Sequence, residues 1–283
     1  MPVAAPIDLL HLGRPRSIGC YLIDTDDGPA LFDCGPATTV DALENALGAE
    51  GLRITDVRHL LLSHIHLDHA GAAGLLVRRN PELRVHVSEI GAPHLVDPSR
   101  LERSARRLYG DSFDTLWGEL VPVPESSVDI VGESVLGLEC FPTPGHASHH
   151  VSYLDRDGTL YAGDAAGVRI QPGRYVMPPT PPPEFDLEVW QRTVDEIERR
   201  DPERLALIHF GVANDPQRHL ADLRLELYDW AEFIRGGATE EEFIAYGLAA
   251  LENAGEDMTT YDVAMPLWQS YRGLQRWAEK QAG

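Results

Sequence analysis

The chain contains 283 residues, of which 43% are hydrophobic, enough for one large core or two smaller ones. Its 45 acidic and 24 basic residues give a formal net charge of −21. A field of this sign repels phosphate backbones and anionic lipid headgroups, which argues against nucleic-acid and membrane partners. The three cysteines, Cys20, Cys34 and Cys140, form no CxxC pair. A disulfide framework is therefore not expected, and the composition fits a reducing compartment.

The amino-terminal segment also indicates the cellular compartment of the protein. Met1–Gly13 has neither the basic region nor the long apolar core of a signal peptide. No apolar run approaches the roughly 20 residues that a helix needs to cross a bilayer. We therefore expect a cytoplasmic protein.

Short strands and helices alternate in the first part of the chain. The expected strands, two of them joined by a turn at Asp26-Asp27-Gly28, are Ile7–Leu12, Ile18–Asp24, Ala30–Cys34, Val57–Leu62 and Arg84–Val87. The expected helices are Thr39–Ala49, Gly71–Arg79 and a charged stretch, Glu89–Trp117, that Pro93 and Pro98 interrupt.

The second part of the chain repeats strands and then changes to helices alone. The expected strands are Gly137–Phe141, His150–Asp155, Thr159–Ala162 and Leu205–His209, and a helix is expected over Leu187–Arg200. After residue 215 the pattern predicts only helices, over Gln217–Arg235, Thr239–Asn253 and Tyr261–Lys280. This order predicts an α/β sandwich over residues 1–215 and a helical extension, 216–283, packed on it.

One histidine-rich motif stands out in the first half. It reads His64-Ile65-His66-Leu67-Asp68-His69 and directly follows a predicted buried strand. In an extended segment His64 and His66 project to the same side, so both imidazoles can reach one ion. Asp68 and His69 fall at the turn into a helix, where the chain changes direction and their side chains could bind a second ion. The pattern H-x-H-x-D-H is expected by chance in roughly two of a thousand chains of this composition.

Three further strand ends carry side chains that can bind metal. These are His146 in Thr143-Pro144-Gly145-His146, Asp164 after Gly163, and His209 before Phe210-Gly211. Open α/β sheets place their sites at such carboxyl ends of strands. Five imidazoles and two carboxylates suit zinc, manganese or iron better than calcium.

These motifs resemble the signature of the metallo-β-lactamase-fold hydrolase superfamily, and the match extends over about residues 7–211. The resemblance implies a four-layer αββα sandwich. It implies one metal ion held by His64, His66 and His146. It implies a second ion held by Asp68, His69 and His209, with Asp164 bridging the two. It also matches Asp33 to an early aspartate of the family that orients an imidazole.

The resemblance further implies a reaction. Two divalent ions, zinc as the preferred metal and manganese or iron as alternatives, would lie roughly 3.5–4 Å apart and share a hydroxide nucleophile. Asp68 and Asp164 are the catalytic candidates, because either carboxylate could steer a proton. The expected function is hydrolysis of an ester, thioester, lactone or related bond of a small molecule.

Several alternatives stay open. A mononuclear-iron sulfur dioxygenase of the same fold is the alternative function, and a degenerate binding protein is disfavoured because all seven positions are filled. The helical extension is similar to that of glyoxalase II in being helical and rich in aromatic residues. The glutathione-binding residues of that family do not match residues of this chain. The aromatic side chains of the extension could form a core, a lid or a homodimer contact.

Other residues receive structural interpretations. His11, His149 and His150 are expected to serve packing rather than chemistry. The proline-rich loop Arg169–Pro183 is expected to form a stiff wall of the pocket. Within that loop, Tyr175 and Met177 could border the substrate or simply pack.

Overall fold

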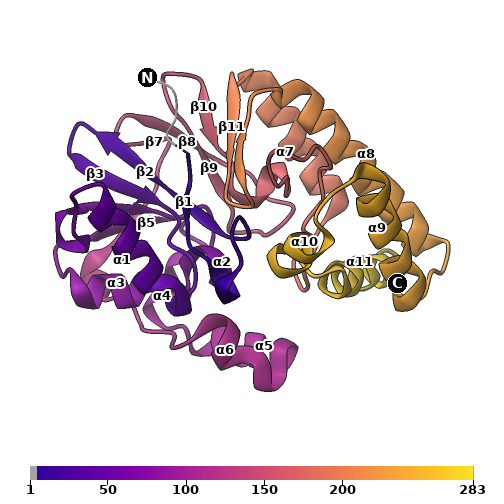
Figure 1. Cartoon of the computed structure of the whole chain (residues 1–283), viewed down its shortest axis with the longest axis horizontal. Coiled ribbons are helices and arrows are strands. Elements are labelled where there is room, and N and C mark those ends of the chain that lie inside the picture. The colour runs from indigo at the N-terminus through magenta and orange to yellow at the C-terminus, as the bar shows by residue number, and fades with distance from the viewer. Residues whose placement is uncertain (1–4, 283) are drawn as a thin grey trace.

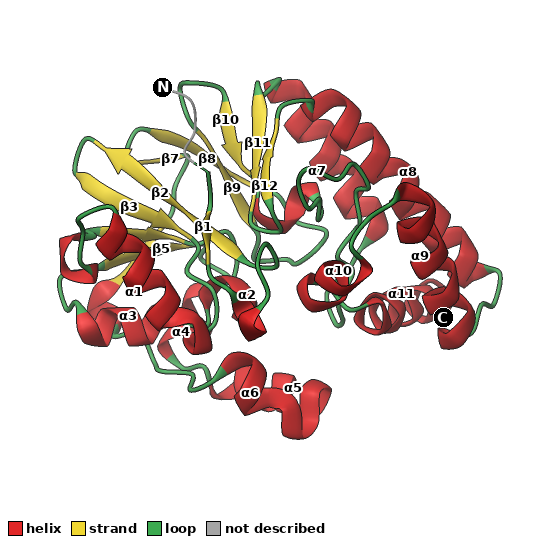
Figure 2. Ribbon diagram, viewed as in Figure 1, coloured by secondary structure: helices red, strands yellow, loops and turns green. Residues whose placement is uncertain are grey.

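Two β-sheets face each other, and helices cover their outer faces (Figures 1 and 2). The computed structural model describes residues 5–282. Residues 1–4 of the amino-terminal segment and residue 283 of the predicted extension lie outside that range. The architecture confirms the predicted α/β class, a four-layer αββα sandwich with a carboxy-terminal helical extension.

The first sheet has six strands in sequence order. Its strands are β1 (Ile7–Asp8), β2 (Gly19–Thr25), β3 (Gly28–Phe32), β4 (His59–Leu61), β5 (Arg84–Val87) and β6 (Val128–Ile130). The pairs β1–β2 and β2–β3 are antiparallel, and β3 to β6 run parallel. The carboxyl ends of β3, β4 and β5 therefore meet at one edge of the sheet.

The second sheet has the reverse order, β12-β11-β10-β9-β8-β7. Its strands are β7 (Ser134–Val135), β8 (Leu138–Pro142), β9 (Val151–Leu154), β10 (Thr159–Tyr161), β11 (Arg204–Leu207) and β12 (Gly211–Ala213). Only β10 and β11 are parallel. Their shared direction brings the segments after Tyr161 and after Leu207 to the same edge.

Helices cover the first sheet, flank the second sheet and, in one region, project away from both (Figure 1). Those of the first half are α1 (Val40–Ala49), α2 (Leu67–Ala70), α3 (Ala73–Arg79), α4 (Ala92–Val96), α5 (Ser99–Tyr109) and α6 (Phe113–Trp117). Those of the second half are α7 (Leu187–Arg200), α8 (Pro216–Arg235), α9 (Glu240–Ala254), α10 (Met258–Ala264) and α11 (Leu267–Ala282). In Figure 1 α1 and α3 cover the first sheet, α7 and α8 flank the second, and α5 and α6 project away from both.

Aromatic side chains join the inner faces of the two sheets. The Phe32 ring meets the rings of Tyr153 and Tyr161 at centroid distances of 5.8 and 5.4 Å. The Tyr21 hydroxyl donates to the carbonyls of Leu207 and Gly211, on the opposite sheet. The Tyr153 hydroxyl likewise donates to the Leu62 carbonyl, so these two buried hydroxyls are satisfied while their rings contribute apolar burial to the inter-sheet core.

The helical extension does not have a core of its own. Its buried residues, such as Trp230 and Trp277, belong to one cluster with α7 and with the outer face of the second sheet. Gly273 of α11 lies so close to the proline-rich segment that a Cβ there would collide with the Thr180 carbonyl oxygen. The predicted boundary at residue 215 stays a prediction. Within residues 5–282, no helix combines the length and apolar character needed to cross a bilayer.

The structure corrects several predicted elements. The first strand ends at Asp8, and a 3₁₀ turn, His11–Gly13, takes the place of its second half. The last predicted helix is two helices, α10 and α11, because Pro266 cannot continue a helix. Strands β6, β7 and β12 were not predicted, since two or three residues are too few for a periodic pattern.

Candidate metal centre

The seven predicted ligand side chains converge at one edge of the sandwich. Five of them follow a strand: His64 and His66 follow β4, His146 follows β8, Asp164 follows β10 and His209 follows β11. Asp68 and His69 lie in the short helix α2, which begins directly after His66. The two sheets thus contribute to one cluster from opposite sides, as strand ends at a common edge must.

Three imidazoles form the first group. The Nε2 atom of His146 lies 3.2 Å from Nε2 of His64 and 2.9 Å from Nδ1 of His66. One ligand atom from each of the three residues therefore falls within the reach of a single ion. These are the three residues that the resemblance implies for the first metal.

A carboxylate and two imidazoles form the second group, Asp68, His69 and His209. The Asp68 Oδ2 atom lies 3.3 Å from His209 Nε2 and 3.7 Å from His69 Nε2. Asp164 lies between the groups, with Oδ1 3.4 Å from His69 Nε2 and Oδ2 3.3 Å from His146 Nε2. Its two oxygens therefore face different groups, which is the position expected of a bridge.

Outer hydrogen bonds orient the imidazoles. The Nδ1–H of His146 donates to the Pro179 carbonyl at 2.7 Å, and that of His209 donates to the Ser17 carbonyl at 2.6 Å. Because a carbonyl only accepts, Nδ1 of each ring must carry a proton, and Nε2 is the nitrogen that faces the cluster and can bind a cation when the ring is neutral. A fixed tautomer of this kind is typical of metal-binding histidines.

Asp33 and Ser63 orient the other two rings. One Asp33 oxygen accepts from the Ser63 backbone N–H, and the other accepts from the Ser63 hydroxyl and from His69 Nδ1–H, all at 2.7 Å. The Ser63 hydroxyl in turn lies 2.9 Å from His64 Nδ1. Asp33 is fully buried and has a φ of 55°, a conformation that aspartate and asparagine tolerate best among non-glycine residues. The structure thus places Asp33 where the resemblance implies it.

Burial and neighbouring charges separate the protonation states within the cluster. Burial and the adjacent imidazoles hold the pKa of His64 well below its usual value, so the ring is neutral. Burial would raise the pKa of Asp164, but His69 and His146 outweigh it and keep the carboxyl ionised. Burial would likewise lower the pKa of His69, yet Asp164 and Asp68 raise it well above normal. The carboxylates therefore favour added positive charge at this site.

The cluster fits a divalent metal. Among residues 5–282, both Asp164 oxygens and the Nε2 atoms of His69 and His209 are buried without a hydrogen-bond partner. Buried carboxylate oxygens that accept no hydrogen bond are costly, and the lone pairs of His64, His66 and His146, about 3 Å apart, repel one another. Cations bound by these atoms would remove both penalties. The donor set of nitrogen and carboxylate oxygen suits zinc, manganese or iron.

Two further histidines serve the site indirectly. His150 bonds the Thr143 hydroxyl through Nδ1 and accepts from the Asp164 backbone N–H through Nε2 at 3.2 Å. It therefore supports the backbone that carries Asp164, in line with its predicted structural role. His149 stacks on His64, with ring centroids 5.9 Å apart, and also lines the cavity described next.

A cavity of about 550 Å³ opens onto the cluster. His66 and Asp68 are the cluster residues in its lining. Its walls come from α5 and α6 on one side and from the α10–α11 connection on the other, with mostly apolar side chains such as Leu108, Trp117 and Met265. The volume and lining are those of a small-molecule site.

The predicted proline-rich wall is present in part. Pro181, Pro182 and Pro183 line the cavity, and the Arg169 backbone exchanges hydrogen bonds with the segment at His209. Tyr175 and Met177 do not line it. Met177 is fully buried, and the Tyr175 hydroxyl donates to Glu226, so both residues pack.

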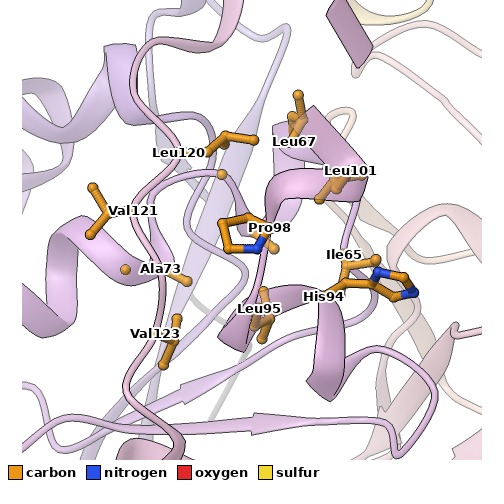
Figure 3. Close-up of a pocket in the computed structure, with 13 residues that line it drawn as sticks. Ile65, Leu67, Ala73, His94, Leu95, Pro98, Leu101, Leu120, Val121 and Val123 are labelled. Atoms are coloured by element: carbon orange, nitrogen blue, oxygen red, sulfur yellow. The ribbon is translucent and has the colours of Figure 1, made fainter. Parts of the chain in front are cut away.

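A second, apolar cavity of about 20 Å³ lies next to the large one (Figure 3). The two cavities share Ile65, Leu67, His94 and Leu101 in their linings. Its other walls are side chains such as Leu120 and Val123, which offer a water molecule no partner. It is a small packing gap behind α5.

Sequence reasoning missed part of this site. Ser63 directly precedes the motif and could have been suspected from that position. The carbonyls of Ser17 and Pro179 carry no sequence signal, because every residue has one. The cavity lining by His11 and Trp117 was not anticipated, since it depends on how distant segments pack.

Comparison with known proteins agrees with this geometry. A family model of the metallo-beta-lactamase superfamily matches residues 13–209. The chain is 28% identical over 156 residues to the uncharacterized protein YobT of Bacillus subtilis, covering 54% of this chain and 63% of YobT. It is 26% identical over 172 residues to an N-acyl homoserine lactonase of a Bacillus species, covering 53% and 60%. The match spans less than two thirds of either relative.

Solved structures share the fold. The metallo-beta-lactamase family protein TTHA1429 of Thermus thermophilus superposes with a TM-score of 0.69 at 21% identity, over 98% of this chain and 93% of that one. The di-iron-bound form of TTHA1623 superposes with a TM-score of 0.58 at 23% identity, over 77% and 96%. At these identities the likeness concerns the fold alone.

Proposed function

This chain belongs to the metallo-β-lactamase superfamily, and we propose that it is a binuclear metallo-hydrolase cleaving an ester, thioester or lactone bond of a small apolar molecule. One observation carries the proposal. Two groups of potential ligands, His64/His66/His146 and Asp68/His69/His209, lie side by side. Between them lies the Asp164 carboxylate, whose oxygens accept no hydrogen bond from the described residues. The two groups adjoin a cavity large enough for a substrate.

In the proposed reaction the cations would activate the nucleophile, and the protein would hold the ligands in place. Two divalent ions held by the two groups would provide an activated water nucleophile and polarise the attacked carbonyl. The outer bonds from Asp33, Pro179 and Ser17 hold the imidazoles rigidly. This preorganisation lowers the reorganisation needed during reaction.

The two candidate catalytic carboxylates have different surroundings. Asp164 is 1% exposed and does not line the cavity, so it would bind the metal ions rather than contact the substrate. Asp68 does line the cavity. In the proposed mechanism the Asp68 carboxylate holds the proton of the attacking water and passes it to the leaving group.

The shape of the cavity supports an apolar substrate body. Leucine, proline and aromatic side chains dominate its lining, and Arg100 is the one guanidinium there among the described residues. Its carboxylates, Asp68, Glu184 and Asp262, would repel a multiply charged anion. The similarity to an N-acyl homoserine lactonase supports lactones as one substrate class.

The alternative is a mononuclear-iron sulfur dioxygenase. The two filled ligand groups favour the hydrolase, because a mononuclear enzyme needs only one of them. Iron stays an alternative to zinc in a binuclear site, because the donor set of imidazole nitrogen and carboxylate oxygen suits both metals.

Metal analysis and a substrate panel test the proposal. Protein reconstituted with zinc, manganese or iron should retain two ions per chain. It should hydrolyse at least one of p-nitrophenyl butyrate, γ-decalactone, N-hexanoyl homoserine lactone and S-hexanoyl-N-acetylcysteamine. Well under one ion per chain would refute the metal site. One iron per chain with oxygen uptake on glutathione persulfide would establish the dioxygenase instead.

A further inference from the structure

A strained turn at the rim of the cavity directs a histidine inward. Leu10 and Leu12 have φ values of 51° and 52°, a left-handed conformation that bulky side chains avoid. The result is an alternation of side chains: Leu10 is 50% and Leu12 49% exposed, whereas His11 between them is 1% exposed.

The His11 ring belongs to an aromatic wall of the cavity. It lies parallel to the Trp117 indole of α6, with centroids 5.6 Å apart and planes inclined by 13°. Trp117 meets Tyr109 of α5 at 5.2 Å, and Tyr109 meets Trp268 of α11 at 6.1 Å. All four residues line the cavity, together with Asp68 of the metal centre. The wall therefore joins three segments that are distant in sequence.

Polar groups in this wall lack partners. Counting residues 5–282, the His11 ring makes no hydrogen bond, and its Nδ1 atom and the Trp117 Nε1–H are buried unpaired. A neutral imidazole offers one donor and one acceptor, and an indole offers one donor. Buried groups of this kind are normally satisfied. Tyr109, by contrast, already donates to Gln269 at 3.1 Å.

We propose that His11, backed by Trp117, is a specificity-determining residue that hydrogen-bonds an uncharged oxygen of the substrate, such as an amide carbonyl or a hydroxyl, away from the bond that is cleaved. The inference rests on the proposed function for the identity of the reaction. Among the described residues His11 Nε2 has no hydrogen-bond partner and, unlike Nδ1 and the Trp117 Nε1–H, is not fully enclosed, so it is the nitrogen that a substrate oxygen can reach. The nearby Asp68 carboxylate disfavours an anionic oxygen there. The preferred substrate thus carries a neutral polar group on an apolar body.

Paired lactones test this contact. N-hexanoyl homoserine lactone and γ-decalactone share a lactone ring and an apolar chain, but only the first has an amide. His11→Phe keeps the ring stacked on Trp117 and removes both nitrogens. We expect it to raise KM for the amide-bearing lactone about tenfold, the effect of losing one hydrogen bond, with kcat within about twofold. The KM for γ-decalactone should not change.

Conservative variants identify the nitrogen. A glutamine amide can replace Nε2 and an asparagine amide Nδ1, so His11→Gln should restore most of the lost affinity and His11→Asn should not, because Nδ1 is buried. Leu10→Gly is the matched control, because it keeps the left-handed turn, relieves its strain and leaves the cavity lining intact. It should leave both KM values unchanged.

The outcomes separate this inference from the proposed function. If the metal-loaded protein hydrolyses neither lactone, the proposed function fails for this class, and calorimetric Kd values for the same two compounds then test His11 directly. An equal loss for both lactones, or a loss of bound metal in His11→Phe, would overturn the proposal, because His11 would then act through the metal centre. Unchanged KM and Kd values would overturn it as well.

Discussion

The floor and the walls of the large cavity are built in different ways. The floor consists of side chains at strand ends, nearly all buried, with most imidazoles bonded to a second group behind them. The walls come from α5, α6 and the α10–α11 connection, which lie outside the two sheets (Figure 2). Wall residues such as Ser104, Leu108 and Val263 are only partly buried or exposed.

This difference suggests that the floor of the cavity carries out the reaction and that the walls select the substrate. Atoms that hold cations must keep their positions within fractions of an ångström, and a hydrogen-bonded sheet edge provides that rigidity. Helices that contact an apolar substrate body can shift or change side chains at little cost to the sandwich. Substitutions in the floor should therefore lower kcat, and substitutions in the walls should alter KM. Three of the four predictions below test this division, and the fourth concerns the attachment of the helical extension.

The largest effect is expected for Asp164→Asn. The amide supplies no charge and binds cations weakly, so the two ions would be held with less compensation for their repulsion. We expect at least ~100-fold loss of kcat, comparable to losing ~2.7 kcal/mol of transition-state stabilisation. Circular dichroism should remain normal, because apolar strands dominate the core. Asp195→Asn, an exposed partner of Arg224, is the matched control. A variant that retains two ions and full activity would show that Asp164 is not the bridge.

Asp33→Asn should have the next largest effect. Asparagine tolerates the φ of 55° but lacks the charge that accepts from Ser63 and His69. Removing such an outer partner lowers metal affinity by about 10- to 100-fold. Competition with a chelator measures this affinity. Asp129→Asn, which removes the same charge beside Arg84, should leave it unchanged. Equal affinities for the Asp33 variant and the unmodified chain would contradict the assignment.

Acid should weaken the attachment of the helical extension. His219 of α8 is fully buried, and its Nε2–H donates to the Ala166 carbonyl, two residues after Asp164. Burial lowers the pKa of His219 to about 4, so the folded state favours the neutral ring. This stability is present above pH 6.5 and is lost as the pH falls from 6.5 toward 4.

A substitution can measure how much of the acid-induced loss of stability is due to His219. Its shift predicts a loss of about 2 kcal/mol in the free energy of unfolding between pH 7 and pH 5. His219→Gln keeps a donor for Ala166 without a titrating group, so its urea midpoint should fall less over that range. If both proteins lose the same stability, His219 is not responsible.

The smallest effect is expected in the wall. Leu108→Ala removes apolar contact from the α5 side of the cavity. We expect KM for p-nitrophenyl octanoate to rise roughly fivefold while that for the acetate and the kcat values stay constant. Leu225→Ala, an exposed leucine on α8, is the matched substitution away from the cavity. A fall in kcat for both esters would mean that walls and floor are coupled.

Local patterns were sufficient for much of this molecule. The motif from His64 to His69 places four side chains within six residues, so its convergence follows from backbone geometry alone. Strand ends marked by glycine and proline located His146, Asp164 and His209. Gly145 shows why the glycine is needed, since its φ is 129° and a Cβ there would collide with Trp190. Pro266 also held the signal for the break between α10 and α11, which the helical pattern obscured.

What the sequence by itself determined is thus most of the strands, the α/β class and the residues that converge, because each depends on periodicity or spacing over a few residues. Only the tertiary structure decided which groups complete the site. The carbonyls behind His146 and His209 come from Pro179 and Ser17, 33 and 192 residues away. The wall that joins His11, Tyr109, Trp117 and Trp268 has the same origin. An apolar helix face specifies that it is buried but not which surface buries it, since the hydrophobic effect is non-directional.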